Sequence, residues 1–233
     1  MSLGLAIVGH GKMGKLIERL APEHGFEVRA KFDGRNNGNA QALSRETLRG
    51  VDVAVEFTAP QAALENIRRL AVLGVNAVVG TTGWLEQLPS AREAVEQGKT
   101  GLVWAPNFSV GVNLFFEVVA HAAALFAGHP EYEAWGWEIH HGAKKDELSG
   151  TLKKLAEEMR AAGYLRPVGL SANRAGAHPG THEIGFDSAA DTITLRHTAR
   201  SREGFAHGAL RAARWIAGKK GFFEFKEILG ELG

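Results

Sequence analysis

Residues 3–14 read LGLAIVGHGKMG and decide the fold of this 233-residue chain. The apolar run over residues 3–8 predicts a buried strand, and apolar residues recur at helical spacing over residues 13–20. A strand, a glycine turn and a helix in this order are typical of a unit that binds a dinucleotide. In such a turn Gly9 makes the tight bend, Gly11 lets the ligand approach the backbone, and Gly14 lets helix and strand pack closely.

A second predicted strand over residues 26–32 ends at Asp33. An acidic residue about 20 positions beyond the glycines is the expected partner of the ribose hydroxyls. A glycine turn without a ligand would explain the glycines but would leave Asp33 as a coincidence. Arg35 and Lys12 can meet a 2′-phosphate, whereas Asp33 would repel it. We therefore expect a site that takes NADH, NADPH or both.

Strands and helices continue to alternate up to residue 108. The apolar segments 51–57, 77–80 and 102–104 predict three more strands with helices between them. This order favours a Rossmann-like, doubly wound parallel sheet, whose ligands bind at the carboxyl ends of the strands. The segments at these ends are Phe57-Thr58, Gly80-Thr81-Thr82-Gly83 and Ala105-Pro106-Asn107-Phe108.

The pattern changes after Phe108, which predicts a second domain of the α+β class. Residues 109–204 contain a long helix, a tryptophan-rich strand, another helix, and two strands over 181–186 and 192–198. We expect a mixed or antiparallel sheet there. The segment from about residue 205 to 233, with a helix to residue 217 and a short helix within 222–232, is expected to return to the first domain, residues 1–108.

The composition favours a small-molecule ligand. The chain is 45% hydrophobic and 23% charged, and its net charge of +1 gives no field that would attract nucleic acid. It has no cysteine and no basic segment before its first apolar run, so we expect a cytoplasmic protein. Asn113, Glu117 and His121 recur every four residues in the apolar run 111–127, which predicts an amphipathic, mostly buried helix and no membrane span.

Residues 138–151 read EIHHGAKKDELSGT and concentrate the candidate chemistry. Alternation over residues 134–139 predicts a half-buried strand whose tryptophans pack in the core, and it places His140 and His141 on opposite faces. Ser149 or Thr151 can cap the helix that follows. A strand end with histidine and lysine that runs into a helix N-terminus suits a carboxylate, and a histidine with its ordinary pKa near 6.5 can donate a proton beside it.

Plainer interpretations of these residues exist. An arbitrary histidine pair is more often bonded to backbone, and two adjacent lysines usually form a solvated turn. A metal site is disfavoured, because strand neighbours diverge and no acidic or second histidine partner lies at ligand spacing. We interpret His178, His182 and His197 as structural or solvent-facing.

Together the motifs resemble those of the dihydrodipicolinate reductase (4-hydroxy-tetrahydrodipicolinate reductase) family. The motifs are GHGKMG from Gly9, FTAP from Phe57, GTTG from Gly80, APNFSVGVN from Ala105 and HHxxKxDxxSGT from His140. The resemblance covers nearly the whole chain. It implies hydride transfer from NADH or NADPH to a cyclic dicarboxylic imine in the diaminopimelate route to lysine. It also implies a C-terminal domain that binds the substrate and forms a homotetramer.

The resemblance further implies roles for individual residues. His140 is the candidate general acid and Lys144 its cationic partner, and no metal is expected. The implied substrate-binding residues are His141, Ser149, Gly150, Thr151 and Thr82. The implied cofactor-binding residues are Gly9, Gly11, Lys12, Met13, Gly14, Asp33, Arg35, Phe57, Thr58, Gly80, Thr82, Ala105, Asn107 and Phe108.

The chain departs from the family pattern at two places. The family commonly has DAPSGT where residues 146–151 read DELSGT, so the proline that stiffens the helix entry is lost at Leu148. Gly142 and Ala143 stand where basic residues are common. Both changes bear on substrate affinity more than on the reaction. Two other functions stay open: another two-domain NAD(P) oxidoreductase, such as an aspartate or homoserine dehydrogenase, and a non-catalytic NAD(P)H-binding protein.

Overall fold

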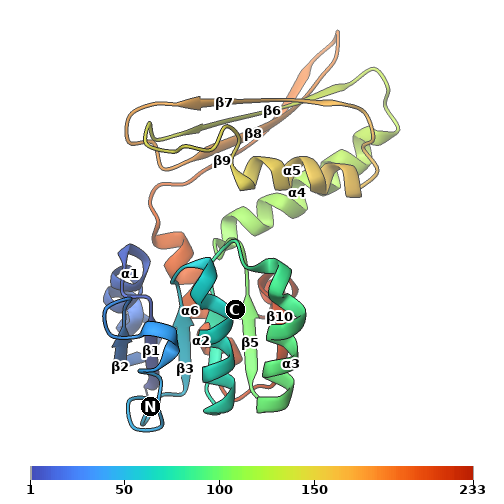
Figure 1. Ribbon diagram of the computed structural model, residues 1–233. Coiled ribbons are helices and arrows are strands. Elements are labelled where there is room, and N and C mark those ends of the chain that lie inside the picture. Colours follow the sequence, from blue (N-terminus) through green and yellow to red (C-terminus); the bar gives the residue numbers. More distant parts are fainter. Residues whose placement is uncertain (1, 233) are drawn as a thin grey trace. The chain divides into compact units, whose positions relative to one another are not determined.

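The computed structural model describes residues 2–232, which divide into two compact units. Unit 1 is formed by the chain up to Val110 and from Glu203 onward, and unit 2 is formed by Gly111–Arg202. Both units are visible in Figure 1, where the chain is coloured along its sequence.

Unit 1 is built on a six-stranded sheet in which all neighbouring strands are parallel. The order is β10-β5-β4-β3-β1-β2. The strands are β1 (Leu3–Val8), β2 (Phe26–Phe32), β3 (Val53–Glu56), β4 (Asn76–Val79), β5 (Gly101–Trp104) and β10 (Gly221–Glu224). This confirms the Rossmann-like sheet predicted from the alternation of strands and helices. The edge strand β10 differs from the prediction, which gives this segment only a short helix.

Helices cover both faces of this sheet. Leu5 and Ile7 of β1 pack with α1 (Lys12–Leu20) and α6 (Glu203–Ile216) on one face. Ala6 and Val8 pack with α2 (Pro60–Val72) and α3 (Leu88–Gly98) on the other. The alternation follows from the two-residue period of a strand. Short 3-10 helices lie at Ala21–His24 (η1), Gly38–Ala40 (η2), Leu85–Gln87 (η3) and Phe225–Glu231 (η4).

Unit 2 combines a four-stranded mixed sheet with two helices. The strand order is β7-β6-β8-β9, with β6 parallel to β7, and with the β6–β8 and β8–β9 pairs antiparallel. The elements are α4 (Val110–Ala127), β6 (Glu133–His140), α5 (Gly150–Ala161), β7 (Val168–Arg174), β8 (Thr181–Asp187) and β9 (Thr192–Thr198). Both helices pack on one face of the sheet (Figure 1). The mixed sheet confirms the predicted α+β class.

The buried face of β6 is the opposite of the predicted one. Ala134, Gly136 and Glu138 are buried on the helix side, whereas Trp135 and Trp137 are only half-buried on the other side. The prediction that the tryptophans form the core was wrong, because side chains from β7, β8 and α5 already occupy the space beside Gly136. A charged residue therefore points into the interior of unit 2.

Helix α4 is half-exposed, and the prediction that it is mostly buried was wrong. Phe115 and Val119 pack in the unit 2 core, but Leu114 and Val118 are 51% and 52% exposed. By length and composition alone, α4 is apolar enough to cross a membrane. A helix that packs one face in a protein core has the same length and composition, so these two properties do not indicate a membrane span.

Candidate functional site

The residues expected to bind a dinucleotide lie at the carboxyl edge of the unit 1 sheet. Phe57 connects several of them: a Cβ built on Gly9 would lie 2.1 Å from its carbonyl oxygen, and one built on Gly80 would lie 2.1 Å from its ring. Its ring centroid is 6.2 Å from that of Phe108. The structure thus brings these four residues together. The other expected residues of this edge that follow β3, β4 and β5 are Thr58, Thr82, Ala105 and Asn107.

The glycine turn fits a pyrophosphate. Gly9 has φ +101°, and a Cβ on Gly14 would lie 2.2 Å from the Gly9 carbonyl oxygen, so the fold itself requires both glycines. A Cβ on Gly11 would meet no atom within 4 Å, which leaves open space beside the backbone. Helix α1 then begins at Lys12, followed by Met13, without a side-chain cap and without an acidic residue in its first turn. Its first amides can therefore serve an anion.

Asp33 stands at the end of β2, beside the glycine turn. Its Oδ1 accepts hydrogen bonds from the backbone N–H groups of Arg35 (2.8 Å) and Asn36 (3.3 Å), which orders the loop. The backbone N–H groups of Gly9 and the next residue both donate to the carbonyl of Phe32, so the two strand ends are joined. Arg35 is exposed, as is Lys12 in the glycine turn. Acidic and basic groups therefore coexist where the adenosine ribose is expected.

Glu56 at the end of β3 is a buried acid that sequence reasoning did not single out. Its side chain is fully buried, and its Oε1 accepts from the Thr58 hydroxyl and from Asn66 Nδ2 at 3.2 Å. Burial raises the pKa of Glu56, and the hydrogen bond from Thr58 opposes the rise. Thr58 N also donates to Thr81 Oγ1 at 2.7 Å, while Thr82 is exposed. Glu56 therefore supports the loop from within.

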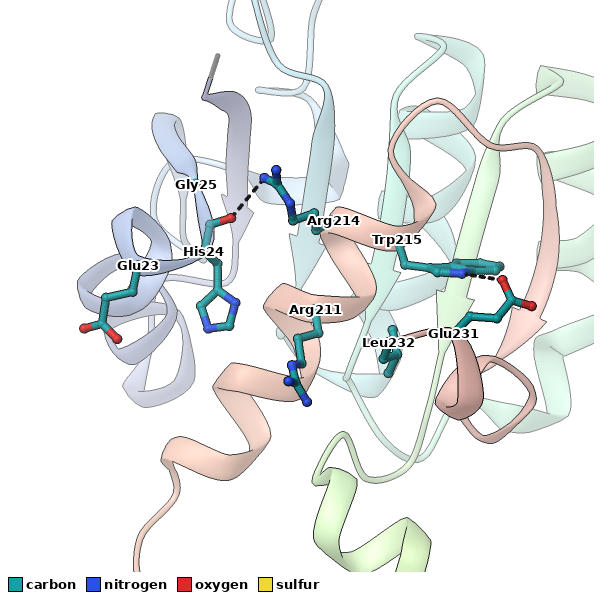
Figure 2. A pocket seen from close by; sticks show the side chains of 8 residues that line it. All are labelled: Glu23, His24, Gly25, Arg211, Arg214, Trp215, Glu231 and Leu232. Carbon is teal, nitrogen blue, oxygen red and sulfur yellow. Dashed lines mark hydrogen bonds between the residues drawn. The ribbon is translucent and has the colours of Figure 1, made fainter.

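A cavity of about 500 Å³ lies at the other edge of the same sheet (Figure 2). Gly25 precedes β2 and accepts a hydrogen bond from Leu3 N, so the cavity adjoins the amino ends of the strands. Two hydrogen bonds join its walls. Arg214 Nη1 donates to the His24 carbonyl, and the Trp215 indole donates to the Glu231 carboxylate. It is therefore separate from the expected dinucleotide site. Its lining residues are Glu23, His24, Gly25, Arg211, Arg214, Trp215, Glu231 and Leu232.

In unit 2, residues 138–151 form the end of β6, a loop and the start of α5. Ser149 is the residue that caps α5, since its Oγ accepts from Leu152 N at 3.1 Å. Ser149 also donates twice to Glu138, through its backbone N–H at 2.9 Å to Oε1 and through its hydroxyl to Oε2. Both donors of Ser149 are thus engaged within the protein. The first helical amides, those of Gly150 and Thr151, come next.

Glu138 is the centre of this arrangement. Its side chain is fully buried, Oε1 also accepts from Arg174 Nη2 at 2.9 Å, and Oε2 lies 3.3 Å from His182 Nε2. Burial by itself raises the pKa of Glu138, but the hydrogen bonds from His182, Ser149 and Arg174 outweigh burial and lower the pKa to about 2. Glu138 is therefore a carboxylate at every physiological pH.

His140 lies on the same side of β6. Its Nδ1 is 3.6 Å from Glu138 Oε1, and its ring centroid is 5.1 Å from that of His182. Burial lowers the pKa of His140 to about 4; the Glu138 charge opposes this, and the charges of His182, Lys144 and Arg174 add to it. In this structure His140 is thus neutral at pH 7, whereas its ordinary pKa would leave a sizeable protonated fraction.

The remaining motif residues lie in the loop. Strand β6 ends at His140, so His141 lies beyond it and the predicted alternation of the two histidines does not extend to it. Lys144 Nζ donates to Asp146 Oδ2 at 2.8 Å, so its charge is paired within the loop. Gly180 lies on the other side of His140, where an added Cβ would be 3.0 Å from Nε2.

Glu138, His140 and His182 offer ligand atoms that all lie within 4.8 Å of one another. The expectation that His140 has no acidic or second histidine partner was therefore wrong; the partner histidine comes from β8, which the motif does not include. Ser149 and Arg174 already use lone pairs of Glu138 that a metal would need, and the guanidinium adds a positive charge. The group fits a hydrogen-bonded network better than a cation site.

Arg174 at the end of β7 also holds the loop that enters α5. Its Nη2 donates to the carbonyls of Asp146 at 2.8 Å and Glu147 at 2.9 Å. Leu148 packs against the unit 2 core. Hydrogen bonds and burial thus fix the entry where the family commonly has proline. Sequence reasoning did not single out Arg174.

Comparisons with known proteins match the whole length of the chain. Residues 3–108 match the family model for the N-terminus of dihydrodipicolinate reductase, and residues 111–229 match the model for its C-terminus. The 4-hydroxy-tetrahydrodipicolinate reductase of Christiangramia forsetii is 34% identical over an alignment of 241 positions, which covers 99% of each chain. That of Methanosarcina barkeri is 32% identical over an alignment of 266 positions, which covers 98% of this chain and 99% of the relative. Among solved structures, dipicolinate-bound dihydrodipicolinate reductase from Paenisporosarcina sp. TG-14 has the same fold, with a TM-score of 0.82 at 23% identity, covering 98% of this chain and 100% of that one.

Proposed function

This chain belongs to the dihydrodipicolinate reductase family, and from that premise we propose that it reduces 4-hydroxy-tetrahydrodipicolinate with NADH or NADPH, in the diaminopimelate route to lysine. One observation carries the proposal beyond the family match. In unit 2 a single buried carboxylate, Glu138, contacts both a candidate proton donor, His140, and the start of a helix suited to a substrate carboxylate. The solved relative named above holds dipicolinate, which is a small dicarboxylate.

The start of α5 is the proposed binding site for a substrate carboxylate. The amides of Gly150 and Thr151 are its first helical donors, and the helix dipole favours negative charge there. Because Glu138 engages both donors of Ser149, Ser149 contributes by fixing the helix start. Lys144 would leave Asp146 for the substrate, and His141 and Thr82 are proposed as further substrate contacts.

His140 is the proposed general acid. Hydride addition to the ring leaves electron density that must be protonated, and an imidazole beside it can donate the proton. A dianionic substrate adds negative charge next to His140 and so raises the pKa that burial has lowered. We therefore expect His140 to gain its proton when substrate binds. Lys144 keeps the substrate charge compensated during the reaction.

The carboxyl edge of unit 1 is the proposed cofactor site. Bound NADH or NADPH would supply the hydride, and the protein orients it. The open space at Gly11 and the uncapped start of α1 suit the pyrophosphate, Asp33 suits the ribose hydroxyls, and Arg35 with Lys12 suits a 2′-phosphate. The other residues of the proposed site are Gly9, Met13, Gly14, Phe57, Thr58, Gly80, Thr82, Ala105, Asn107 and Phe108.

We also propose a homotetramer that works in the cytoplasm. The sheet face of unit 2 opposite α4 and α5 carries Trp135 and Trp137, both half-buried, and the two helices of unit 2 pack on the other face. An uncovered sheet face with large aromatic residues is typical of an association surface. Light scattering on the purified protein measures the assembly, and a monomer at micromolar concentration would contradict it.

The activity is tested with the condensation product of pyruvate and aspartate semialdehyde, by following nicotinamide absorbance. His140→Ala and Lys144→Ala should each lower the rate at least about a hundredfold, the scale of a lost acid–base group, while NADH still binds. Lys145→Ala, an exposed neighbour, is the matched control. No turnover by the native protein would contradict the function, and near-native rates in both variants would contradict the catalytic assignment.

A further inference from the structure

We propose that Glu138 is a positioning residue: it holds His140 with the proton on Nδ1, so that Nε2 is the proton-delivering atom, and it holds the start of α5 in register with that atom. The inference rests on the proposed function for its meaning in catalysis. Its geometry lies entirely within unit 2.

The first step concerns the orientation of His140. Its Nδ1 is buried without a hydrogen-bond partner in residues 2–232, and the carboxylate oxygen Oε1 of Glu138 lies 3.6 Å away. An N–H group facing a permanent anion is favoured, whereas a nitrogen lone pair facing it is repelled. Nδ1 is thus the nitrogen that carries the proton in the neutral ring. A proton that arrives later goes to Nε2 and leaves from it.

The second step concerns the space around Nε2. This atom faces Gly180, whose φ is +140°, and a Cβ there would lie 3.0 Å from Nε2 and 3.2 Å from Cδ2. A glycine at this position therefore keeps the outer nitrogen clear of a side chain. Nδ1 of His140 thus faces the Glu138 carboxylate, and Nε2 faces a residue without a side chain. This arrangement lets Nε2 deliver a proton to a ligand in one defined direction.

The third step links His140 to the substrate-binding helix. The same carboxylate accepts both donors of Ser149, and Ser149 in turn caps α5 through Leu152 N. Arg174 holds Glu138 in place and compensates its charge in the interior. A movement of Glu138 would therefore displace the proton donor and the start of α5 together.

The fourth step is electrostatic. Four ionisable groups act on His140: Glu138 from its own strand, Arg174 from β7, His182 from β8 and Lys144 from the loop. Glu138 is the anionic member of this set. If its charge is removed, the remaining charges disfavour protonated His140, and the fraction of enzyme able to donate a proton falls at any given pH.

The test is Glu138→Gln, compared with Glu138→Asp and with Glu133→Gln, an exposed glutamate on the same strand. At pH 7 we expect Glu138→Gln to lower kcat at least about tenfold. We expect the rate to recover as pH falls, because His140 then needs a lower pH to be protonated. Glu138→Asp should keep the native pH profile, and Glu133→Gln should keep both rate and profile. A rate loss in Glu138→Gln with an unchanged pH profile would mean a merely structural role and would overturn the proposal, as would an unchanged rate.

Nitrogen NMR of His140 provides a readout that does not depend on turnover. In native protein we expect the neutral ring to carry its proton on Nδ1, and its titration to move to lower pH in Glu138→Gln; the opposite tautomer or an unmoved titration would overturn the proposal. If native protein shows this NMR behaviour but no reductase activity, the proposed function fails and the positioning role stands. If native protein is active and the titration is unmoved, the reverse holds.

Discussion

Replacing Arg174 by methionine should destabilise unit 2 through an uncompensated buried charge. The variant keeps the apolar stem but removes the guanidinium that pairs with Glu138 at 2.9 Å. Glu138 is fully buried and the Arg174 side chain is 19% exposed, so solvent can replace the lost partner only poorly. The variant also frees the carbonyls of Asp146 and Glu147 from the donor that now holds them.

Two considerations set the scale of the cost. Removing one partner of a buried ion pair typically costs about 3–5 kcal/mol, and Glu138 keeps its bonds from Ser149, which favours the lower end. The lowering of the Glu138 pKa from 4.5 to about 2 corresponds to about 3 kcal/mol of net stabilisation, which is what all its partners contribute beyond the opposing effect of burial. We therefore expect a loss of about 3 kcal/mol, which lowers Tm by roughly 6–12 °C in a chain of this size.

Thermal and urea unfolding at pH 7 measure this loss, with Arg196→Met as the control. Arg196 pairs with Glu183 at 3.0 Å on the same sheet but is 57% exposed, so its loss should cost less than about 1 kcal/mol. A lowered carboxylate pKa stabilises the fold above pH 4.5, and this contribution disappears as pH falls towards 2. The gap between native protein and Arg174→Met should therefore shrink in acid. Equal losses in the two variants, or a gap that persists near pH 2, would refute the reasoning.

Gly180→Ala should lower kcat about tenfold or more, because its Cβ would press on His140 Nε2 at 3.0 Å; Gly163→Ala, also at a positive φ but in open space, is the control for backbone strain, and equal effects would count against crowding of Nε2. Arg35→Ala should raise the Kd for NADPH about tenfold while the Kd for NADH stays, as expected for one lost charge-assisted contact to a 2′-phosphate, and an unchanged ratio of the two Kd values would remove Arg35 from cofactor choice. Glu56→Gln should be more stable than native protein at pH 8, with the difference closing towards pH 4. Because burial raises the pKa of Glu56, the contribution of this group to stability is fully present below its ordinary pKa and is lost as pH rises through its pKa in the folded protein. Tm measured against pH tests this, and parallel curves would contradict it.

Local periodicity was enough to predict five of the six strands of the unit 1 sheet, because β1, β3 and β4 are each followed by a helix that covers the sheet. It failed for strands that form only by pairing with distant segments of the chain. Strand β10 has only four residues, and its partner β5 lies over a hundred residues earlier in the chain. The residues of β7 alternate between half-buried and exposed and include small polar types, so no apolar period marks it. Pairing with β6 is what makes this segment a strand.

The motif around His140 could be found from the sequence, but its partners could not. Arg174 and His182 reach Glu138 only because β7 and β8 flank β6 in register. One signal was present: Glu138 lies on the same face of the strand as the small residues Ala134 and Gly136, and a charge on a buried face needs partners. The size of the tryptophans favoured the opposite face, but the buried face of β6 is decided by the space that neighbouring elements leave, and at Gly136 they leave none for a side chain.

The loss of the proline at Leu148 changes how the entry to α5 is held. A proline restricts the backbone even in the unfolded chain, whereas Leu148 contributes only when its side chain packs on the unit 2 core. The carbonyls of the two preceding residues are bound by Arg174, which itself depends on β7 being paired with β6. The order of the Gly150 and Thr151 amides is therefore a property of the whole folded unit. A substitution that removes the hydrogen bonds from Arg174 to these carbonyls should therefore impair substrate binding even under conditions in which unit 2 stays folded.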